Sequence, residues 1–63
     1  MKVKIKSYYG ELPSYFREGV EYDLTKPVDD LYGGWVYGDD GEDHYILING
    51  CDYLNGGSWE IVE

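Results

Sequence analysis

The residues best suited to chemistry lie in one short stretch, YGDDGEDHYILI, at positions 37–48. It gathers acidic side chains and a histidine around one glycine; they are Asp39, Asp40, Glu42, Asp43 and His44. Clustered carboxylates can bind Ca²⁺, act as an acid–base pair or form a charged contact surface. The same residues are also typical of a tight turn between two strands.

The spacing of these acids does not match a metal site. An EF-hand calcium loop needs oxygen ligands at alternate positions and a glutamate at its last position. Counting from Asp39 puts Gly41 at a ligand position, and counting from Asp40 puts Cys51 at the last one. Structural zinc usually takes four Cys or His ligands, and the chain has one of each. We therefore expect no metal and no cofactor.

The residues that could catalyse a reaction are not linked by spacing. His44 could act as a base and Cys51 or Ser58 as a nucleophile, but a nucleophile needs a base within hydrogen-bond reach and a third group to orient it. The two glycine pairs precede strand-like segments and lack the lysine of a phosphate-binding loop. We expect that the protein is not an enzyme, and that Cys51 is a small buried residue.

The elements that position these residues are short strands. Nine Gly and two Pro interrupt the chain at short intervals, which favours strands joined by turns. Apolar and polar residues alternate in the first segment, which indicates a half-buried strand. The predicted strands are KVKIKSY at the N-terminus, VEYDL at 20–24, WVYG at 35–38, HYILI at 44–48 and WEIVE at 59–63.

Three longer connections join the predicted strands. The first covers residues 8–19, where Pro13 and Ser14 could begin one helical turn. The second covers residues 25–34. The third covers residues 49–58, with a short 3₁₀ turn expected at 51–54. The glycine pairs at 33–34 and 56–57 would let the backbone bend where a strand enters a curved sheet.

Two registers are open for the central hairpin. A two-residue turn at Asp40-Gly41 pairs Val36 with Tyr45, because Asp-Gly suits the positive φ of such turns. A three-residue loop of residues 39–41 with a glycine bulge pairs Val36 with His44 instead. A difference of one residue moves side chains between the faces of the sheet.

Both faces of this hairpin carry apolar or aromatic side chains in either register. A solvated outer face should alternate to polar residues. A barrel of 63 residues has one interior, so we expect the second face to contact a partner, either a second copy or another protein. The alternative is that the connection at 8–19 folds across the outer face.

These features predict one all-β domain over residues 1–63: a five-stranded, strongly bent barrel with one short helical or 3₁₀ turn. Three segments resemble the Src-homology-3-like (SH3-like) barrel; they are FREGVEYDL, WVYGDDGEDHYILI and YLNGGSWEIVE. The chain as a whole resembles small acidic proteins encoded by bacteriophages. The ALYDY-type motif of proline-binding members is absent, so the resemblance does not imply binding to proline-rich peptides.

Charge narrows the class of partner. The formal net charge is −8, and all five Lys and Arg residues lie in the first 26 positions. Such a field repels nucleic acid and anionic membranes and favours basic partners. No apolar run approaches the length of a membrane span, and the single cysteine fits a reducing compartment. We expect a cytoplasmic protein, in the host cytoplasm if it is encoded by a phage.

The combined evidence predicts a small acidic protein-binding module. The resemblance implies a phage-type host-takeover or anti-defence inhibitor that binds a host protein with a basic or nucleic-acid-binding surface. The expected aromatic contact residues are Trp35, Tyr37, Tyr45, Tyr8, Tyr9, Tyr15 and Phe16. The expected acidic rim is Asp39, Asp40, Glu42 and Asp43. The alternatives are a homo-oligomeric binder of a signalling nucleotide and a structural accessory protein.

Overall fold

The computed structural model describes residues 1–25 and 32–62. Most of the predicted connection at 25–34, and the last residue of the predicted final strand, lie outside the described residues. The strands are β1 (Lys2–Ser7), β2 (Tyr22–Thr25), β3 (Gly33–Tyr37), β4 (Asp43–Leu47), β5 (Asn49–Cys51) and β6 (Gly57–Ile61). One 3₁₀ turn, η2 (Asp52–Leu54), connects β5 to β6.

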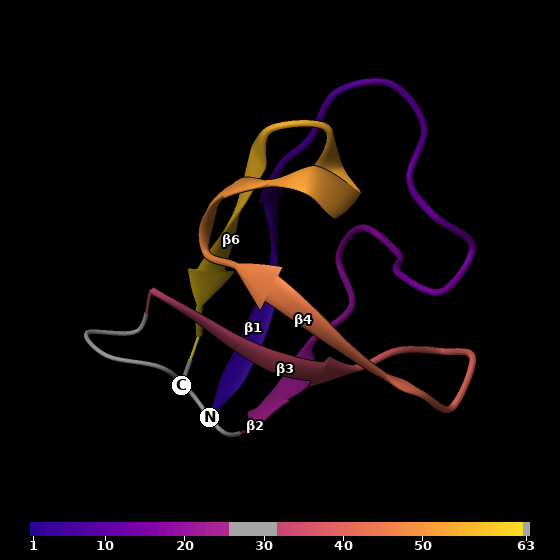
Figure 1. Ribbon diagram of the computed structural model, residues 1–63, viewed down its shortest axis with the longest axis vertical. Helices are drawn as coiled ribbons and strands as arrows, with labels where there is room; N and C mark the ends of the chain where they lie inside the picture. The colour runs from indigo at the N-terminus through magenta and orange to yellow at the C-terminus, as the bar shows by residue number, and fades with distance from the viewer. Residues whose placement is uncertain (26–31, 63) are drawn as a thin grey trace.

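The strands form one antiparallel sheet in the order β4-β3-β2-β1-β6-β5. Figure 1 shows β3 beside β4 and β1 beside β6 in this sheet. The sheet is strongly bent into a small, nearly closed barrel, which is consistent with the SH3-like architecture. The predicted all-β fold is therefore confirmed. The short 3₁₀ turn expected at 51–54 is present; it begins one residue later, at Asp52, and ends at Leu54. Asn55 follows it in the left-handed conformation, with φ of 56°.

Strand alternation places the core. Val3 and Ile5 on β1 face inward together with Tyr22 and Leu24 on β2, as the sequence pattern predicts. The described buried core consists of Val3, Ile5, Phe16, Tyr22, Leu24, Val36, Ile46, Cys51, Leu54 and Trp59. Three of these, Phe16, Tyr22 and Trp59, are aromatic and meet edge to face, so aromatic packing fills much of the small interior.

Ile48 bonds to both sides of the nearly closed barrel. The two outermost strands of the sheet, β4 and β5, are successive parts of one chain segment that bends between them. At the bend the Ile48 N–H donates to the Tyr32 carbonyl (2.9 Å), and the Ile48 carbonyl accepts from the Trp59 N–H (2.8 Å). Ile48 thus connects the β3 side of the sheet to the β6 side.

The sixth strand, β5, lies where a connection was expected. Asn49 pairs with Ser58 and Cys51 with Gly57, and the register shifts between these pairs. The residues Asn-Gly-Cys have little intrinsic preference for strands, so local sequence gave no indication. The strand forms because closure of the barrel brings this segment beside β6.

One glycine of each pair permits close contact between backbones. A Cβ at Gly33 would lie 2.3 Å from the Ile46 carbonyl oxygen, and one at Gly57 would lie 2.1 Å from that of Ser7. Each glycine is the first residue of its strand, Gly33 of β3 and Gly57 of β6. Any side chain at Gly33 or Gly57 would collide with the neighbouring strand, so close contact between backbones, rather than the predicted bending, accounts for glycine at these two positions.

The first connection turns twice rather than forming a helical turn. The Phe16 N–H donates to the Pro13 carbonyl (3.3 Å), and the Val20 N–H donates to the Arg17 carbonyl (3.4 Å). These two turns direct the Phe16 ring into the core, where it is 1% exposed. Tyr8, Leu12 and Tyr15 of the same connection pack against the core.

Candidate functional site

The outer face of β3 and β4 carries three exposed aromatic side chains. Trp35, Tyr37 and Tyr45 are 39%, 56% and 40% exposed, whereas Val36 and Ile46 between them are fully buried. Trp35 lies opposite Tyr45, and their rings meet at 66° with centroids 5.5 Å apart. We call these three residues the aromatic face. The connection at 8–19 leaves this face open, so the alternative in which that loop covers it is wrong.

The hairpin uses the three-residue turn. Val36 pairs with His44, Trp35 pairs with Tyr45, and the Gly38 N–H donates to the Glu42 carbonyl (3.0 Å). Gly41 has φ of 79° and donates its N–H to the Gly38 carbonyl (3.1 Å), which is a turn followed by a glycine bulge. The two-residue alternative at Asp40-Gly41 is therefore wrong. The observed register is the one that puts Trp35 and Tyr45 on the same face.

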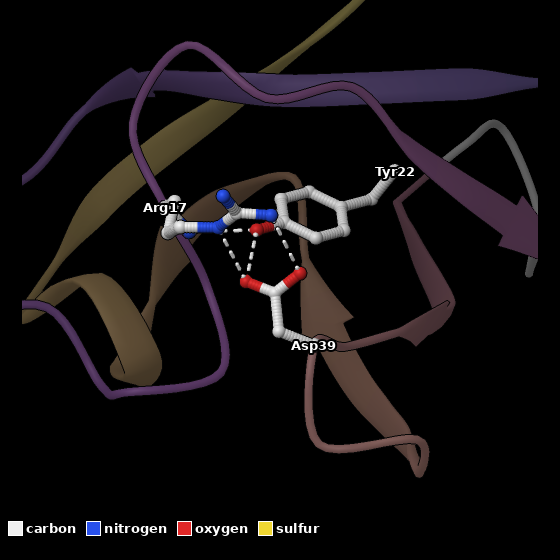
Figure 2. Close-up of polar contacts among 3 residues, drawn as sticks. All are labelled: Arg17, Tyr22 and Asp39. Carbon is white, nitrogen blue, oxygen red and sulfur yellow. Dashed lines mark hydrogen bonds and ion pairs between the residues drawn. The ribbon is translucent and has the colours of Figure 1, made fainter.

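Asp39, one of the four predicted rim acids, has a structural role. It accepts hydrogen bonds from Arg17 Nε (2.8 Å) and Arg17 Nη2 (3.1 Å), and a third from the Tyr22 hydroxyl (3.0 Å), as Figure 2 shows. The Tyr22 hydroxyl in turn accepts from the Arg17 backbone N–H (2.7 Å). We call Arg17, Tyr22 and Asp39 the clamp. It joins the first connection, β2 and the hairpin turn at one point.

Charge balance in the clamp follows from these contacts. The Arg17 guanidinium holds the pKa of the Asp39 carboxyl below its ordinary value, and Asp39 raises the pKa of Arg17. Burial raises the pKa of the Tyr22 hydroxyl, which therefore keeps the proton that it donates. Asp39 and Arg17 neutralise each other, so neither adds to the charge that the turn presents to a partner.

Asp40 is also bonded within the turn. Its carboxylate lies 3.0 Å from His44 Nε2 and accepts from the Glu42 backbone N–H (3.2 Å). The His44 ring stacks on Tyr15 with centroids 4.0 Å apart and planes 5° from parallel. Because two acids of the turn are held in this way, Glu42 and Asp43 are the exposed members without a side-chain partner among the described residues.

The aromatic residues of the first connection do not extend the aromatic face. Phe16 is buried in the core, so its predicted contact role is wrong: the turns of this loop direct its ring inward. Tyr15 is half-buried against His44 and Tyr53. Tyr8 is half-buried and donates to Glu18 (3.2 Å), while Tyr9 is exposed beside η2 and donates its N–H to the Leu54 carbonyl.

A shallow groove lies beside β4, where the sheet is not quite closed. Its volume is about 390 Å³, and it is lined by Tyr45, Leu47, Cys51, Asp52 and Tyr53. We call it the edge groove. It meets the aromatic face at Tyr45. The sequence does not predict that Leu47, Asp52 and Tyr53 line a groove. These residues lie close together because the chain bends at Ile48, and no local sequence pattern indicates that bend.

Two kinds of feature bear on metal and membrane binding, groups of metal ligands and membrane-spanning helices. Within residues 1–25 and 32–62, no group of three or more His, Cys, Asp or Glu side chains is placed to hold a metal ion. The same part of the chain has no helix of the length and apolar character required to cross a membrane. Cys51 is buried, as expected, and is a free thiol.

No protein-family model, curated protein or solved structure matches the chain. The function is therefore inferred from the surface itself.

Proposed function

We propose that the protein is a small acidic binding module that occupies a basic surface of another protein through the aromatic face. The observation that carries this proposal is the exposure of Trp35, Tyr37 and Tyr45 on one side of a hairpin whose other side buries Val36 and Ile46. Large aromatic residues dominate binding energy at protein interfaces. Surface aromatic residues grouped in this way are costly to leave in water unless a partner covers them.

The acids beside the aromatic face set the kind of partner. Glu42 and Asp43 lie at the end of the hairpin that carries Tyr37. With a net charge of −8, the whole molecule attracts a basic protein and repels nucleic acid. The resemblance to small acidic phage proteins supports a host protein as the target and inhibition of that protein, in the cytoplasm, as the outcome.

The test is affinity capture from a bacterial lysate, with mass spectrometry of the bound proteins. We compare the wild-type chain with Trp35→Ala and with a matched control, Ile61→Ala, which removes a side chain of similar exposure (38%) on β6. The expected result is a basic protein captured by the wild type and by Ile61→Ala. Trp35→Ala should weaken its capture by at least about tenfold.

Salt provides a second readout on the same captured protein. Steering by Glu42, Asp43 and the overall charge predicts that association slows as ionic strength rises. Equal capture by Trp35→Ala and the wild type would contradict the aromatic face as the contact surface. Capture that is independent of salt would contradict a basic target.

A further inference from the structure

The outer edge of β4 is an unpaired strand edge. Hydrogen bonds at both ends of the hairpin show which residues of β4 direct their backbone groups toward β3. The Gly38 N–H donates to the Glu42 carbonyl, and the Ile48 N–H donates to the Tyr32 carbonyl, so the even-numbered residues face β3. In an antiparallel pair, every second residue directs its N–H and C=O toward its partner strand. Asp43, Tyr45 and Leu47 therefore direct their backbone groups away from β3.

In the described part of the chain, no strand pairs with that side of β4. β4 pairs with β3 alone, and the nearby β5 pairs with β6. Natural proteins usually block such an edge with lysine, proline, a bulge or a covering loop. The outward-directed residues here include Tyr45 and Leu47, which are neither charged nor proline. The backbone of this edge is consequently ready to pair with an extended chain.

The edge groove runs beside these same residues. Tyr45 and Leu47 of β4 form one wall, and residues of β5 and η2 form the other: Cys51, Asp52 and Tyr53. A strand added to a sheet edge forms main-chain hydrogen bonds, while pockets beside the edge accept alternate side chains. Edge and groove together form such a site, and apolar side chains suit Leu47 and the two tyrosines.

Charge at the ends of the site selects a basic chain. Glu42 and Asp43 lie at the start of β4, and Asp52 lies on the opposite wall of the groove. No Lys or Arg is among the residues that line the groove or make up β4. Arg17, the basic residue tied to the hairpin turn, is bonded to Asp39. An added strand with Lys or Arg at alternate positions would therefore meet carboxylates at both ends.

A second copy of this chain fits the same edge poorly. Antiparallel pairing of two β4 strands about Tyr45 would bring the acidic turn of each copy beside residues 47–52 of the other, including Asp52. Asp52 is the one acid among those residues, but each copy carries a net charge of −8, so the two copies repel each other as whole molecules. A basic segment of another protein has no such repulsion.

We propose that the β4 edge binds an extended basic segment of the partner protein as an added antiparallel strand, with apolar side chains of that segment in the edge groove. This inference rests on the proposed function and specifies how the partner is held. The aromatic face continues the same surface through Tyr45, so one bound segment would contact both.

The experiment is amide hydrogen exchange by NMR on the full chain, with and without a short end-blocked peptide of alternating Lys and Val. The free protein should show fast exchange at Tyr45 and Leu47, because their amides face solvent, and slow exchange at Ile46. Added peptide should slow exchange at Tyr45 and Leu47 by at least about tenfold and leave Ile46 unchanged. A peptide of alternating Glu and Val is the charge control and should have no effect.

Two variants with the same change in net charge test the site. Leu47→Lys puts a cation on the edge and should abolish the peptide effect. Glu60→Gln raises the net charge equally but lies on β6, so it should leave the effect in place. If Leu47→Lys fails to fold, Asp43→Lys at an exposed position of the same edge replaces it, and Glu60→Lys becomes the control with the same change in net charge.

Three results would overturn the inference, and they separate it from the proposed function. Shifts at the Trp35 indole without slower exchange at Tyr45 and Leu47 mean that the aromatic face binds and the edge does not. If the Lys–Val peptide at millimolar concentration changes neither the exchange rates nor the NMR shifts, the inference about the edge is also overturned. The proposed function is then tested separately, by the capture experiment with Trp35→Ala. Concentration-dependent protection of Tyr45 and Leu47 without peptide assigns the edge to a second copy.

Discussion

Arg17 and Asp39 lie 22 positions apart in the chain and are joined by two parallel hydrogen bonds of 2.8 and 3.1 Å. The pair ties the first connection to the hairpin turn, and Tyr22 joins it from β2. The acidic turn therefore has two parts with different roles. Asp39 and Asp40 are hydrogen-bonded within the fold and hold the turn in place. The carboxylates of Glu42 and Asp43 are exposed and can contact a partner.

Removing the charge of Asp39 should destabilise the protein, whereas the same change at Asp43 should not. Asp39→Asn weakens both bonds from Arg17 and the bond from Tyr22. Asp43→Asn makes the same change in net charge at an exposed position of the same hairpin. Thermal unfolding followed by circular dichroism should show a lower melting temperature for Asp39→Asn alone. Equal melting temperatures for the two variants would contradict a structural role for the clamp.

The contribution of Asp39 should disappear in acid. Its pKa is lowered in the folded state by Arg17, so its stabilisation is complete above its unfolded pKa of about 3.9 and is lost as pH falls through the folded pKa. The gap in melting temperature between wild type and Asp39→Asn should therefore narrow as the pH falls below about 4. Asp23, whose pKa Lys2 lowers, titrates in both proteins and cancels in the difference. A gap that stays constant with pH would contradict this account.

Tyr22→Phe should cost roughly 1–2 kcal/mol of unfolding free energy. The hydroxyl accepts from the Arg17 N–H at 2.7 Å and donates to Asp39 at 3.0 Å, and its ring is buried in the core. The ring stays after substitution, so packing against Phe16 and Trp59 is kept. Urea titration measures the change. A double variant with Asp39→Asn should show less than the sum of the two single effects, because both act on one network.

Gly33 and Gly57, one from each glycine pair, should respond differently to alanine than a glycine in open space. Gly33→Ala and Gly57→Ala each place a Cβ within 2.3 Å of a neighbouring carbonyl oxygen, so each should prevent stable folding. Gly50 has φ of 66° with no atom within 4 Å of a Cβ, so Gly50→Ala should cost about 1–2 kcal/mol from backbone strain alone. Expression yield and urea titration compare the three. Folded Gly33→Ala of normal stability would contradict the close strand contact.

The sequence predicted most of the barrel and one part of its surface. Alternation in KVKIKS and YDLT placed Val3, Ile5, Tyr22 and Leu24 in the core, because a strand with one buried face leaves a period of two in the chain. The aromatic face was predictable for the same reason: Trp35 and Tyr37 alternate with Val36. The sequence is compatible with a two-residue and a three-residue turn, so it does not fix the hairpin register. The positive φ of Gly41 belongs to the three-residue turn.

What the sequence could not predict depends on contacts between distant residues. Phe16 and Tyr9 are both aromatic residues of one glycine-containing loop, yet the first is in the core and the second is exposed. The clamp joins residues from three separate segments, and no local pattern relates Arg17 to Asp39. β5 is a strand only because β6 lies beside it. Each of these features follows from closure of the barrel, not from neighbouring residues.

The junction at Ile48 has a consequence for the order of folding. The β3–β4 hairpin joins neighbours across a three-residue turn, so it can form within microseconds. The β1–β6 ladder joins residues such as Ser7 and Ser58, which are 51 positions apart, and must await closure of a long loop. Ile48 needs both β3 and β6 in place to make its two bonds. The Ile48 N–H bond to Tyr32 extends the hairpin, so the Ile48 amide should gain protection early in pulse-labelled refolding. The Trp59 N–H, which donates to the Ile48 carbonyl from β6, should be among the last amides to gain protection.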